Sequence, residues 1–149
     1  MRIAAFQPDI PGNLGALMRL SVCFGAELHV IQPCGFPYSA KAVRRAAMDY
    51  GREAAIIDHA SWERFVADRP PGRLVLLTTK GAVPHWDVAW EPSDFLLLGR
   101  ESAGAPDYVH DAADARARIA MPGGGRSLNV AIAAGIALAE ATRVFSGAG

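Results

Sequence analysis

A glycine-rich segment near the C-terminus, IAMPGGGRSLNVAIAAG at residues 119–135, carries the clearest chemical signal in this sequence. Three consecutive glycines follow a short apolar run and lead into Ser127, where an apolar helix is expected to begin. A glycine-rich loop that opens a helix commonly binds phosphate, because its free N–H groups and the helix dipole point toward the anion. The segment therefore raises the hypothesis of a nucleotide site.

Neither common phosphate-binding motif fits the spacing of this loop. A Walker loop needs a lysine before its Ser or Thr, and Arg126 stands at that position. The dinucleotide motif needs a third glycine three residues after the second, and Leu128 stands there. The loop therefore has to be interpreted together with the rest of the chain.

The elements that must position this loop alternate between strand and helix, which predicts an α/β fold with helices on both sides of a parallel sheet. The runs LVLLT and FLLLG are nearly continuous apolar stretches, as expected of strands buried on both faces. The expected strands are 3–6, 27–31, 54–57, 74–78, 95–99 and 117–121, and the expected helices are 13–24, 40–50, 61–68 and 127–145.

Ligands of such sheets gather where the strands end at their carboxyl tips. The loops expected there are 78–83, 99–106 and 122–127, and all three contain glycine. They all lie in the second half of the chain. The sequence therefore predicts a binding half and a scaffolding half.

Composition sets limits on the class of protein. The 149 residues suit a single domain, and 51% hydrophobic residues can build a full core. Fifteen basic and fifteen acidic side chains cancel, so a nucleic-acid site would have to be local. No signal sequence is expected, and the apolar run 128–139 is shorter than the roughly 20 residues that span a membrane. A cytoplasmic protein is expected.

The two cysteines, Cys23 and Cys34, lack the paired spacing of a metal site even with His29 between them, so reduced thiols and no metal are expected.

In the last expected helix, small residues recur every four positions at Ala131, Gly135 and Ala139. Such a stripe lets another backbone approach closely. Packing in the core and a subunit interface both remain open.

Three stretches, taken in order, resemble the signature motifs of the SPOUT-class, TrmH-like RNA ribose methyltransferases. They are PGNLGALMR at 11–19, LLLGRESAGAP at 96–106 and RIAMPGGGRSLNVA at 118–131. The motifs run Asn-x-Gly-x-x-x-Arg, then Gly-x-Glu-x-x-Gly, then Ser-Leu-Asn at the last helix. RRAAMDY at 44–50 and LLTTKG at 76–81 look like the single-domain branch that methylates the wobble nucleotide of tRNA.

The resemblance implies a single SPOUT domain over 1–149, whose parallel sheet ends in a C-terminal trefoil knot. The cofactor-binding knot region would span about 74–145. It further implies a homodimer with active sites drawn from both subunits, a tRNA anticodon loop as substrate and no membrane partner.

S-adenosyl-L-methionine is the methyl donor that the resemblance implies, with S-adenosyl-L-homocysteine as its product and no metal. The donor has no phosphate group, so the loops need neither a Walker lysine nor a dinucleotide motif. Glycines would let the main chain approach it closely. Core packing remains an alternative role for Leu77 and Ile119. By motif matching, the donor-binding residues are Leu77, Thr78, Gly99, Gly104, Ile119, Met121, Ser127 and Leu128.

The implied reaction methylates the ribose 2′-hydroxyl of cytidine or uridine 34, in leucine tRNAs. Arg19 matches the catalytic arginine of the family; because guanidinium stays protonated, we expect it to bind RNA phosphate and to stabilise alkoxide charge. Glu101 would orient Arg19 or the loop, or lie solvated. Asn13 and Ser127 match the motifs but are equally plausible helix N-caps. Asn129 would be a buried amide that needs partners.

Basic residues on the expected helix 40–50 are candidates for RNA contact. Lys41, Arg44 and Arg45 fall on one helical face, where a solvated surface is the alternative. Tyr50 could stack on a base, and Lys80 in the TTKG loop could reach RNA. The sequence departs from the family pattern at Arg100, Ala103, Ala105, Ala120 and Ala139, which bears on RNA specificity more than on the donor site.

Three other functions are compatible with parts of this pattern. A methyltransferase of the same class could act on another tRNA or rRNA ribose. An inactive RNA-binding homodimer could keep the fold, although Asn13, Arg19, Glu101, Ser127 and Asn129 are all present. A receiver-like or flavin-binding domain would need an acidic pair or a phosphate loop after the first strand, where QPD offers one carboxylate.

Overall fold

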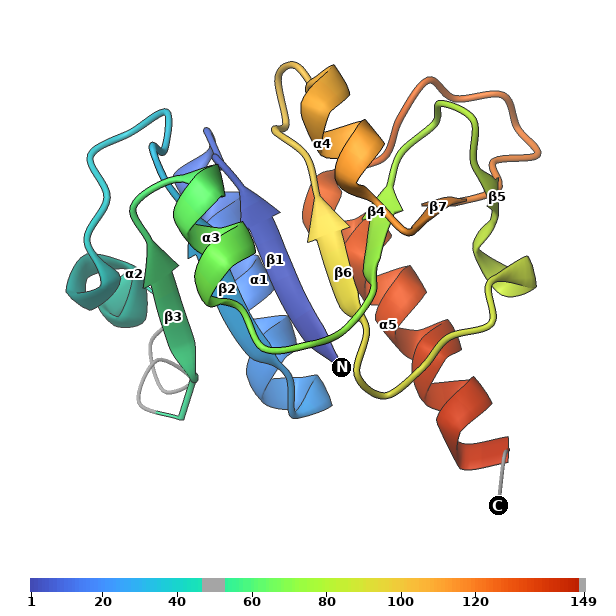
Figure 1. Cartoon of the computed structure of the whole chain (residues 1–149), viewed down its shortest axis with the longest axis horizontal. Coiled ribbons are helices and arrows are strands. Elements are labelled where there is room, and N and C mark those ends of the chain that lie inside the picture. Colours follow the sequence, from blue (N-terminus) through green and yellow to red (C-terminus); the bar gives the residue numbers. More distant parts are fainter. Residues whose placement is uncertain (47–52, 148–149) are drawn as a thin grey trace.

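Parallel pairing joins all seven strands of the sheet, as the computed structural model of the chain shows (Figure 1). The structure describes residues 1–46 and 53–147. The strand order is β3-β2-β1-β6-β4-β7-β5. The expected α/β fold with a parallel sheet is confirmed. The strands are β1 (Arg2–Phe6), β2 (Glu27–Ile31), β3 (Ile56–His59), β4 (Leu74–Leu77), β5 (Val83–Pro84), β6 (Phe95–Leu98) and β7 (Ala115–Arg118).

Side chains alternate between the two faces of the sheet, and each face builds its own core. In β1, Ile3 and Ala5 join one hydrophobic cluster, whereas Ala4 and Phe6 join the other. All four residues of β6 are buried, so this central strand is covered on both faces. Burial under helices on both faces therefore explains the continuous apolar runs, as the sequence predicted.

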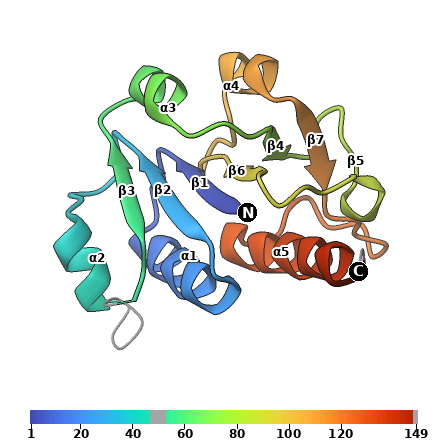
Figure 2. The same ribbon diagram turned by 60° about the horizontal axis from the view of Figure 1, so that its bottom comes forward.

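Helices cover both faces, with α1, α2 and α5 on one and α3 and α4 on the other (Figure 2). Ser61 caps α3 as expected, since its side-chain oxygen accepts a hydrogen bond of 3.1 Å from the Arg64 N–H. A 3₁₀ turn, η2 (His85–Asp87), precedes β6. The helices are α1 (Pro11–Phe24), α2 (Ala40–Ala46), α3 (Trp62–Asp68), α4 (Asp107–Ala112) and α5 (Val130–Gly147).

Several expected boundaries are wrong by two or three residues. The strand expected at 54–57 lies at 56–59, and the one expected at 117–121 lies at 115–118. The last helix begins at Val130 and not at Ser127. The helix expected at 40–50 is α2 as far as Ala46, and its remainder lies outside the described residues.

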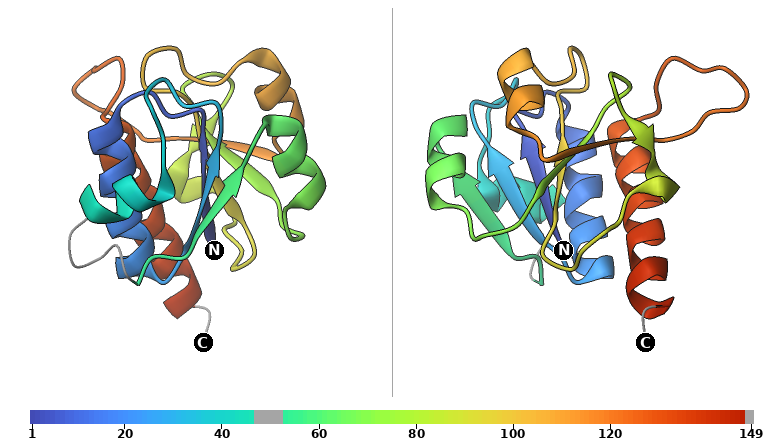
Figure 3. Two further views of the ribbon diagram at one scale, coloured as in Figure 1. Left: turned by 90° about the vertical axis from the view of Figure 1, so that its left-hand side faces the viewer. Right: turned by 45° about the vertical axis from the view of Figure 1, so that its right-hand side comes forward.

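The last helix, α5, is longer than the apolar run that the sequence suggested. Its 18 residues have a mean hydropathy of 1.4, enough by length and composition to cross a membrane. However, Ala134, Ala137, Leu138 and Ala141 of α5 belong to the core cluster that α1 shares, which is how the core helix of a globular domain packs. Figure 3 shows α5 lying beside α1 and the segment before it looping out beyond the sheet.

The stripe of small residues on α5 runs out of the core. Ala131 is buried, Gly135 faces the side chain of Leu20 on α1 and Ala139 is exposed. Core packing therefore explains the first part of the stripe, and a subunit interface at its exposed end stays a prediction.

The trefoil knot concerns how the chain threads through itself. Strand order alone does not test it, and it too stays a prediction.

Two buried histidines pair under α3. The rings of His29 on β2 and His59 on β3 are stacked, with centroids 5.1 Å apart and an interplanar angle of 8°. The Nδ1 of His29 lies 2.9 Å from the Nε2 of His59. The Nε2 of His29 lies 3.4 Å from a carboxylate oxygen of Glu27. Phe65 packs edge-on against both rings. Burial lowers the pKa of both histidines below the ordinary value.

This pair predicts a loss of stability in mild acid. Below about pH 6.5 the unfolded chain takes up protons that folded His29 and His59 resist, so the free energy of unfolding falls as the pH falls, by at most about 1.4 kcal/mol per pH unit for each proton. Urea unfolding at pH 7.5 and 5.5 measures this. The loss should be smaller in His29→Asn than in the wild-type protein. An equal loss in the wild type and His29→Asn would contradict the assignment.

Candidate functional site

A cavity of about 560 Å³ opens at the carboxyl edge of the sheet. The loops after β4, β6 and β7 and the first residues of α1 and α5 bound it. Its volume lies within the roughly 300–1,000 Å³ typical of small-molecule sites. All the residues predicted to bind the donor line this one cavity: Leu77, Thr78, Gly99, Gly104, Ile119, Met121, Ser127 and Leu128.

The wall that β6 contributes is shaped by a close backbone approach at Gly99. The backbones of Arg100 and Gly104 form a reciprocal pair of hydrogen bonds of 3.2 and 2.9 Å, which folds the loop back over Gly99. A Cβ at residue 99 would lie 2.6 Å from the Ala105 nitrogen and 2.7 Å from the Gly104 carbonyl carbon. Gly104 itself has a φ of +68°. The motif glycines at 99 and 104 are therefore required by the path of the chain.

The wall after β4 is held by a hydrogen-bond chain that ends at a histidine the sequence analysis missed. His110 on α4 is buried and lines the cavity. Its Nδ1 lies 3.3 Å from the Pro106 carbonyl oxygen, which can only accept, so the neutral ring carries its proton on Nδ1. Its Nε2 then accepts from the Thr78 hydroxyl at 3.0 Å, and that hydroxyl accepts from the Lys80 N–H at 3.2 Å.

Two motif asparagines that line the cavity are hydrogen-bonded to each other. The Asn129 Nδ2 donates a hydrogen bond of 2.9 Å to the Asn13 Oδ1, linking positions 116 residues apart. The Asn129 Oδ1 accepts from the N–H groups of Ala131 at 2.9 Å and Ile132 at 3.2 Å. Asn129 therefore caps α5 and fixes the start of α1 at once.

These contacts correct the N-cap alternatives for Asn13 and Ser127. The N-cap of α1 is Ile10, which leaves Asn13 inside the first turn. Ser127 lies three residues before Val130, the first residue of α5, and is exposed at the cavity wall. The expectation of a buried Asn129 is also wrong, because its side chain is exposed; its amide is nevertheless hydrogen-bonded on both sides.

Glu101 is half-buried and has a carboxylate neighbour that the sequence analysis treated as isolated. Its Oε2 accepts a hydrogen bond of 2.8 Å from the Asp9 N–H, and the Ser102 hydroxyl donates to the Asp9 carboxylate. Hydrogen bonding with Glu101 and Ser102 lowers the pKa of Asp9, whereas burial raises the pKa of Glu101. Asp9 therefore holds its proton less readily than an ordinary aspartate, and Glu101 takes one up more readily than an ordinary glutamate.

Arg19 does not line the cavity among the described residues. It lies on α1 six residues after Asn13, which places it about 9 Å farther along the helix axis, and it is exposed. The structure thus brings together Asn13, Glu101, Ser127 and Asn129 but not Arg19. The five predicted catalytic roles stay predictions.

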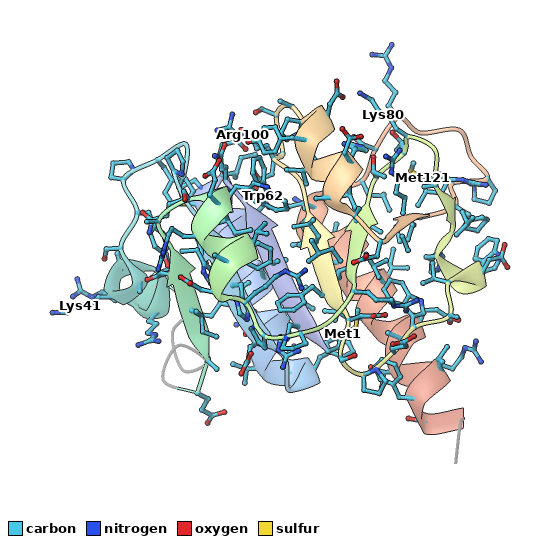
Figure 4. The ribbon with its side chains drawn as sticks, viewed as in Figure 1. Met1, Lys41, Trp62, Lys80, Arg100 and Met121 are labelled. Carbon is cyan, nitrogen blue, oxygen red and sulfur yellow. The ribbon has the colours of Figure 1, made fainter. Side chains whose placement is uncertain are left out.

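The residues predicted to bind RNA fall into two separate regions. Lys80 is exposed and lines the cavity, whereas Lys41, Arg44 and Arg45 are exposed on α2 at the far flank of the sheet. Figure 4 shows this separation, with Lys80 and Met121 above the carboxyl edge and Lys41 beyond β3. Tyr50 lies outside the described residues.

Metal ligands do not cluster in the described part of the chain, where no three His, Cys, Asp or Glu side chains could hold an ion together. Both cysteines are free thiols there. Burial, with the charges of Asp58 and Glu101, raises the pKa of the Cys34 thiol to about 11. Cys34 is therefore a protonated thiol at neutral pH and a poor nucleophile.

Similarity to known proteins covers nearly the whole chain. Residues 1–139 match the SpoU rRNA Methylase family. The tRNA (cytidine(34)-2′-O)-methyltransferase of Ancylobacter novellus is 49% identical over 149 residues, covering 99% of this chain and 94% of the relative. A solved structure described as giving structural insights into the 2-OH methylation of C/U34 on tRNA superposes with a TM-score of 0.90 at 34% identity, covering 98% of this chain and 96% of that one.

A further structure, an AdoMet-bound rRNA methyltransferase from Sinorhizobium meliloti, has a TM-score of 0.83 at 32% identity, covering 95% of this chain and 55% of that one. The fold and the cavity therefore define a methyltransferase of the SPOUT class. The chain belongs to the SpoU rRNA methylase family.

The close approach at Gly99 predicts that Gly99→Ala is strongly destabilising. Backbone atoms at 2.6 and 2.7 Å cannot move aside as a flexible side chain would, so we expect a loss of about 3 kcal/mol in the free energy of unfolding. Urea unfolding measures it. Gly123→Ala is the matched control, because no atom lies within 4 Å of its added Cβ and its φ is not positive. A Gly99→Ala variant as stable as this control would contradict the proposed constraint.

Proposed function

We propose that the protein is an S-adenosyl-L-methionine-dependent tRNA 2′-O-methyltransferase that acts on the wobble nucleotide, cytidine or uridine 34. The observation that carries this proposal is the single cavity where the loops of the second and third family motifs meet Asn13 of the first. The relatives described above support the substrate assignment, because their names specify cytidine 34 or C/U34 of tRNA. Leucine tRNAs are the proposed isoacceptors.

The residues present fit the proposed donor. A cavity walled by glycine backbone at 99 and 104 offers main-chain donors and acceptors for an adenine ring, and Leu77, Ile119 and Met121 supply apolar surface. When bound there, S-adenosyl-L-methionine supplies an electrophilic methyl group. The proposal needs no metal, and related structures bind this donor.

The chemistry asked of the chain is alignment and proton removal. The ribose oxygen forms a bond to the methyl carbon as the carbon–sulfur bond breaks, leaving S-adenosyl-L-homocysteine, and the hydroxyl proton passes to an acceptor. Correct alignment alone can lower such a barrier by about 7–11 kcal/mol. In our proposal Asn13 and Asn129 fix the cavity mouth, and Ser127 and Glu101 line it.

Arg19 has the role of holding an RNA phosphate and stabilising the developing alkoxide. Because it does not line the cavity within one chain, the proposal includes a homodimer, as the family resemblance implies, in which Arg19 and a donor cavity approach each other. A cytoplasmic location follows from the proposed tRNA substrate.

A second candidate substrate is a ribose in another tRNA or in ribosomal RNA. The name of the matched family and the Sinorhizobium relative, both described as rRNA methylases, favour testing it. Mapping ribose methylation in total RNA from cells with and without the gene separates the two: loss confined to nucleotide 34 supports the wobble assignment, and loss elsewhere overturns it.

Replacing Arg19 predicts a separation of binding from chemistry. Arg19→Ala should lower kcat for tRNA methylation at least a hundredfold, because one charge-stabilising donor is commonly worth 10²–10³ in rate. Its Kd for S-adenosyl-L-methionine, measured by calorimetry, should stay within about threefold, since Arg19 lies outside the donor cavity. A variant with full activity would remove Arg19 from the mechanism.

The basic face of α2 predicts a salt-dependent contribution to tRNA binding. Changing Lys41, Arg44 and Arg45 to Ala should lower the slope of log K against log salt by about 2, at roughly 0.7 per phosphate contact of a single strand. Filter binding at several salt concentrations measures it. Changing Arg64 and Arg143, two exposed arginines in local ion pairs, is the control. An unchanged slope in the triple variant would mean that Lys41, Arg44 and Arg45 are solvated and do not contact RNA.

A further inference from the structure

A second, smaller cavity of about 240 Å³ adjoins the donor cavity. The two share the loop residues Arg100, Ala103 and Gly104. The smaller one is otherwise lined by Phe6 and Gln7 at and after the end of β1, and by Pro106 and Tyr108 at the start of α4. The loop that β6 sends over Gly99 is therefore a wall between two compartments, each lined by different partners.

An exposed aromatic ring forms one side of this second cavity. Tyr108 is 51% exposed, yet its ring is held edge-on by Phe6 at 6.1 Å and by Trp62 at 6.2 Å between centroids. Two buried rings thus fix the orientation of a third that is left accessible. Such a ring offers a preformed surface on which a planar ligand can stack.

Uncommitted polar groups complete the cavity. Gln7 has a φ of +44°, a rare conformation for a residue other than glycine, and within the described residues its side-chain amide forms no hydrogen bond. The Nε of Arg100 is buried without an acceptor, and its guanidinium has no carboxylate partner in the described part of the chain. Buried donors are normally paired, so an unpaired one calls for a partner from outside the chain.

We propose that this second cavity binds the nucleobase of the nucleotide whose ribose is methylated. The inference rests on the proposed function. The target ribose must reach the methyl group held in the donor cavity, and its base is joined to it by one bond, so the base must enter a space that adjoins that cavity, as the second cavity does through Arg100, Ala103 and Gly104. Recognition of single-stranded RNA typically combines aromatic stacking with hydrogen bonds to the base edge, and Tyr108, Gln7 and Arg100 supply both kinds of group.

The experiment compares two RNA hairpins that carry the anticodon loop. One has an intact nucleotide 34; the other is abasic there and keeps the ribose 2′-hydroxyl. With wild-type protein, removing the base should lower kcat/KM at least fivefold, because stacking of a base on an aromatic ring is worth about that much or more. Tyr108→Leu keeps an apolar contact with Phe6 and Trp62 but loses the aromatic face, so the ratio of its kcat/KM values for the intact and abasic hairpins should be several-fold smaller than that of the wild-type protein.

Three controls make the outcome specific. Tyr108→Phe should retain the discrimination, because the ring remains. Trp86→Leu should retain it too, since Trp86 is 55% exposed but lines neither cavity. The Kd for S-adenosyl-L-methionine should not change in any of these variants, which separates the base compartment from the donor compartment.

Two results would overturn the proposal while leaving the proposed function intact. These are equal methylation of the two hairpins by wild-type protein, and undiminished discrimination by Tyr108→Leu. Failure of the proposed function gives a different result, in which wild-type protein methylates no ribose in either hairpin or in tRNA. That result would also refute the proposed base-binding role of the second cavity.

Discussion

The site depends on one close approach between backbones, that of Gly99 to the peptide joining Gly104 and Ala105. Because no side chain separates them, the loop after β6 turns back at once and stays within reach of the loops after β4 and β7. A larger residue at 99 would push this loop outward and open the cavity wall. The glycine is thus a steric requirement of the fold first and a requirement of ligand binding as a consequence.

Because the strands are parallel, the loop after β6 lines a cavity on each of its two sides. All strands point the same way, so every carboxyl end reaches the same edge, and the end of β1 lies beside that of β6. One side of the loop faces Leu77, Ile119 and the other residues predicted to bind the donor, and the other side faces Phe6 and Tyr108. The two cavities therefore share this loop as a common wall.

The sequence predicted the central strands, and the grouping of the residues assigned to the donor, better than the contacts that hold them. Long apolar runs identify central strands because burial on both faces demands them, and LVLL and FLLL are such runs. The two-residue β5 and the six-residue α4 were missed, because elements so short carry no readable periodicity. Asp9 and His110 were missed for another reason: each becomes part of the site through partners far away in the sequence, Glu101 and Thr78.

The position of Arg19 on α1 separates the two functions that the sequence motifs predict for one site, donor binding and stabilisation of the alkoxide. Every residue predicted to bind the donor lines one cavity of a single chain. In the proposed mechanism Arg19 stabilises the alkoxide at the ribose oxygen, and in one chain Arg19 lies about 9 Å along the α1 axis from Asn13, which lines the cavity. In the proposed mechanism the arginine therefore meets the ribose in a complex, formed either by RNA bound across α1 or by a second copy of the chain, and the reaction would depend on that complex.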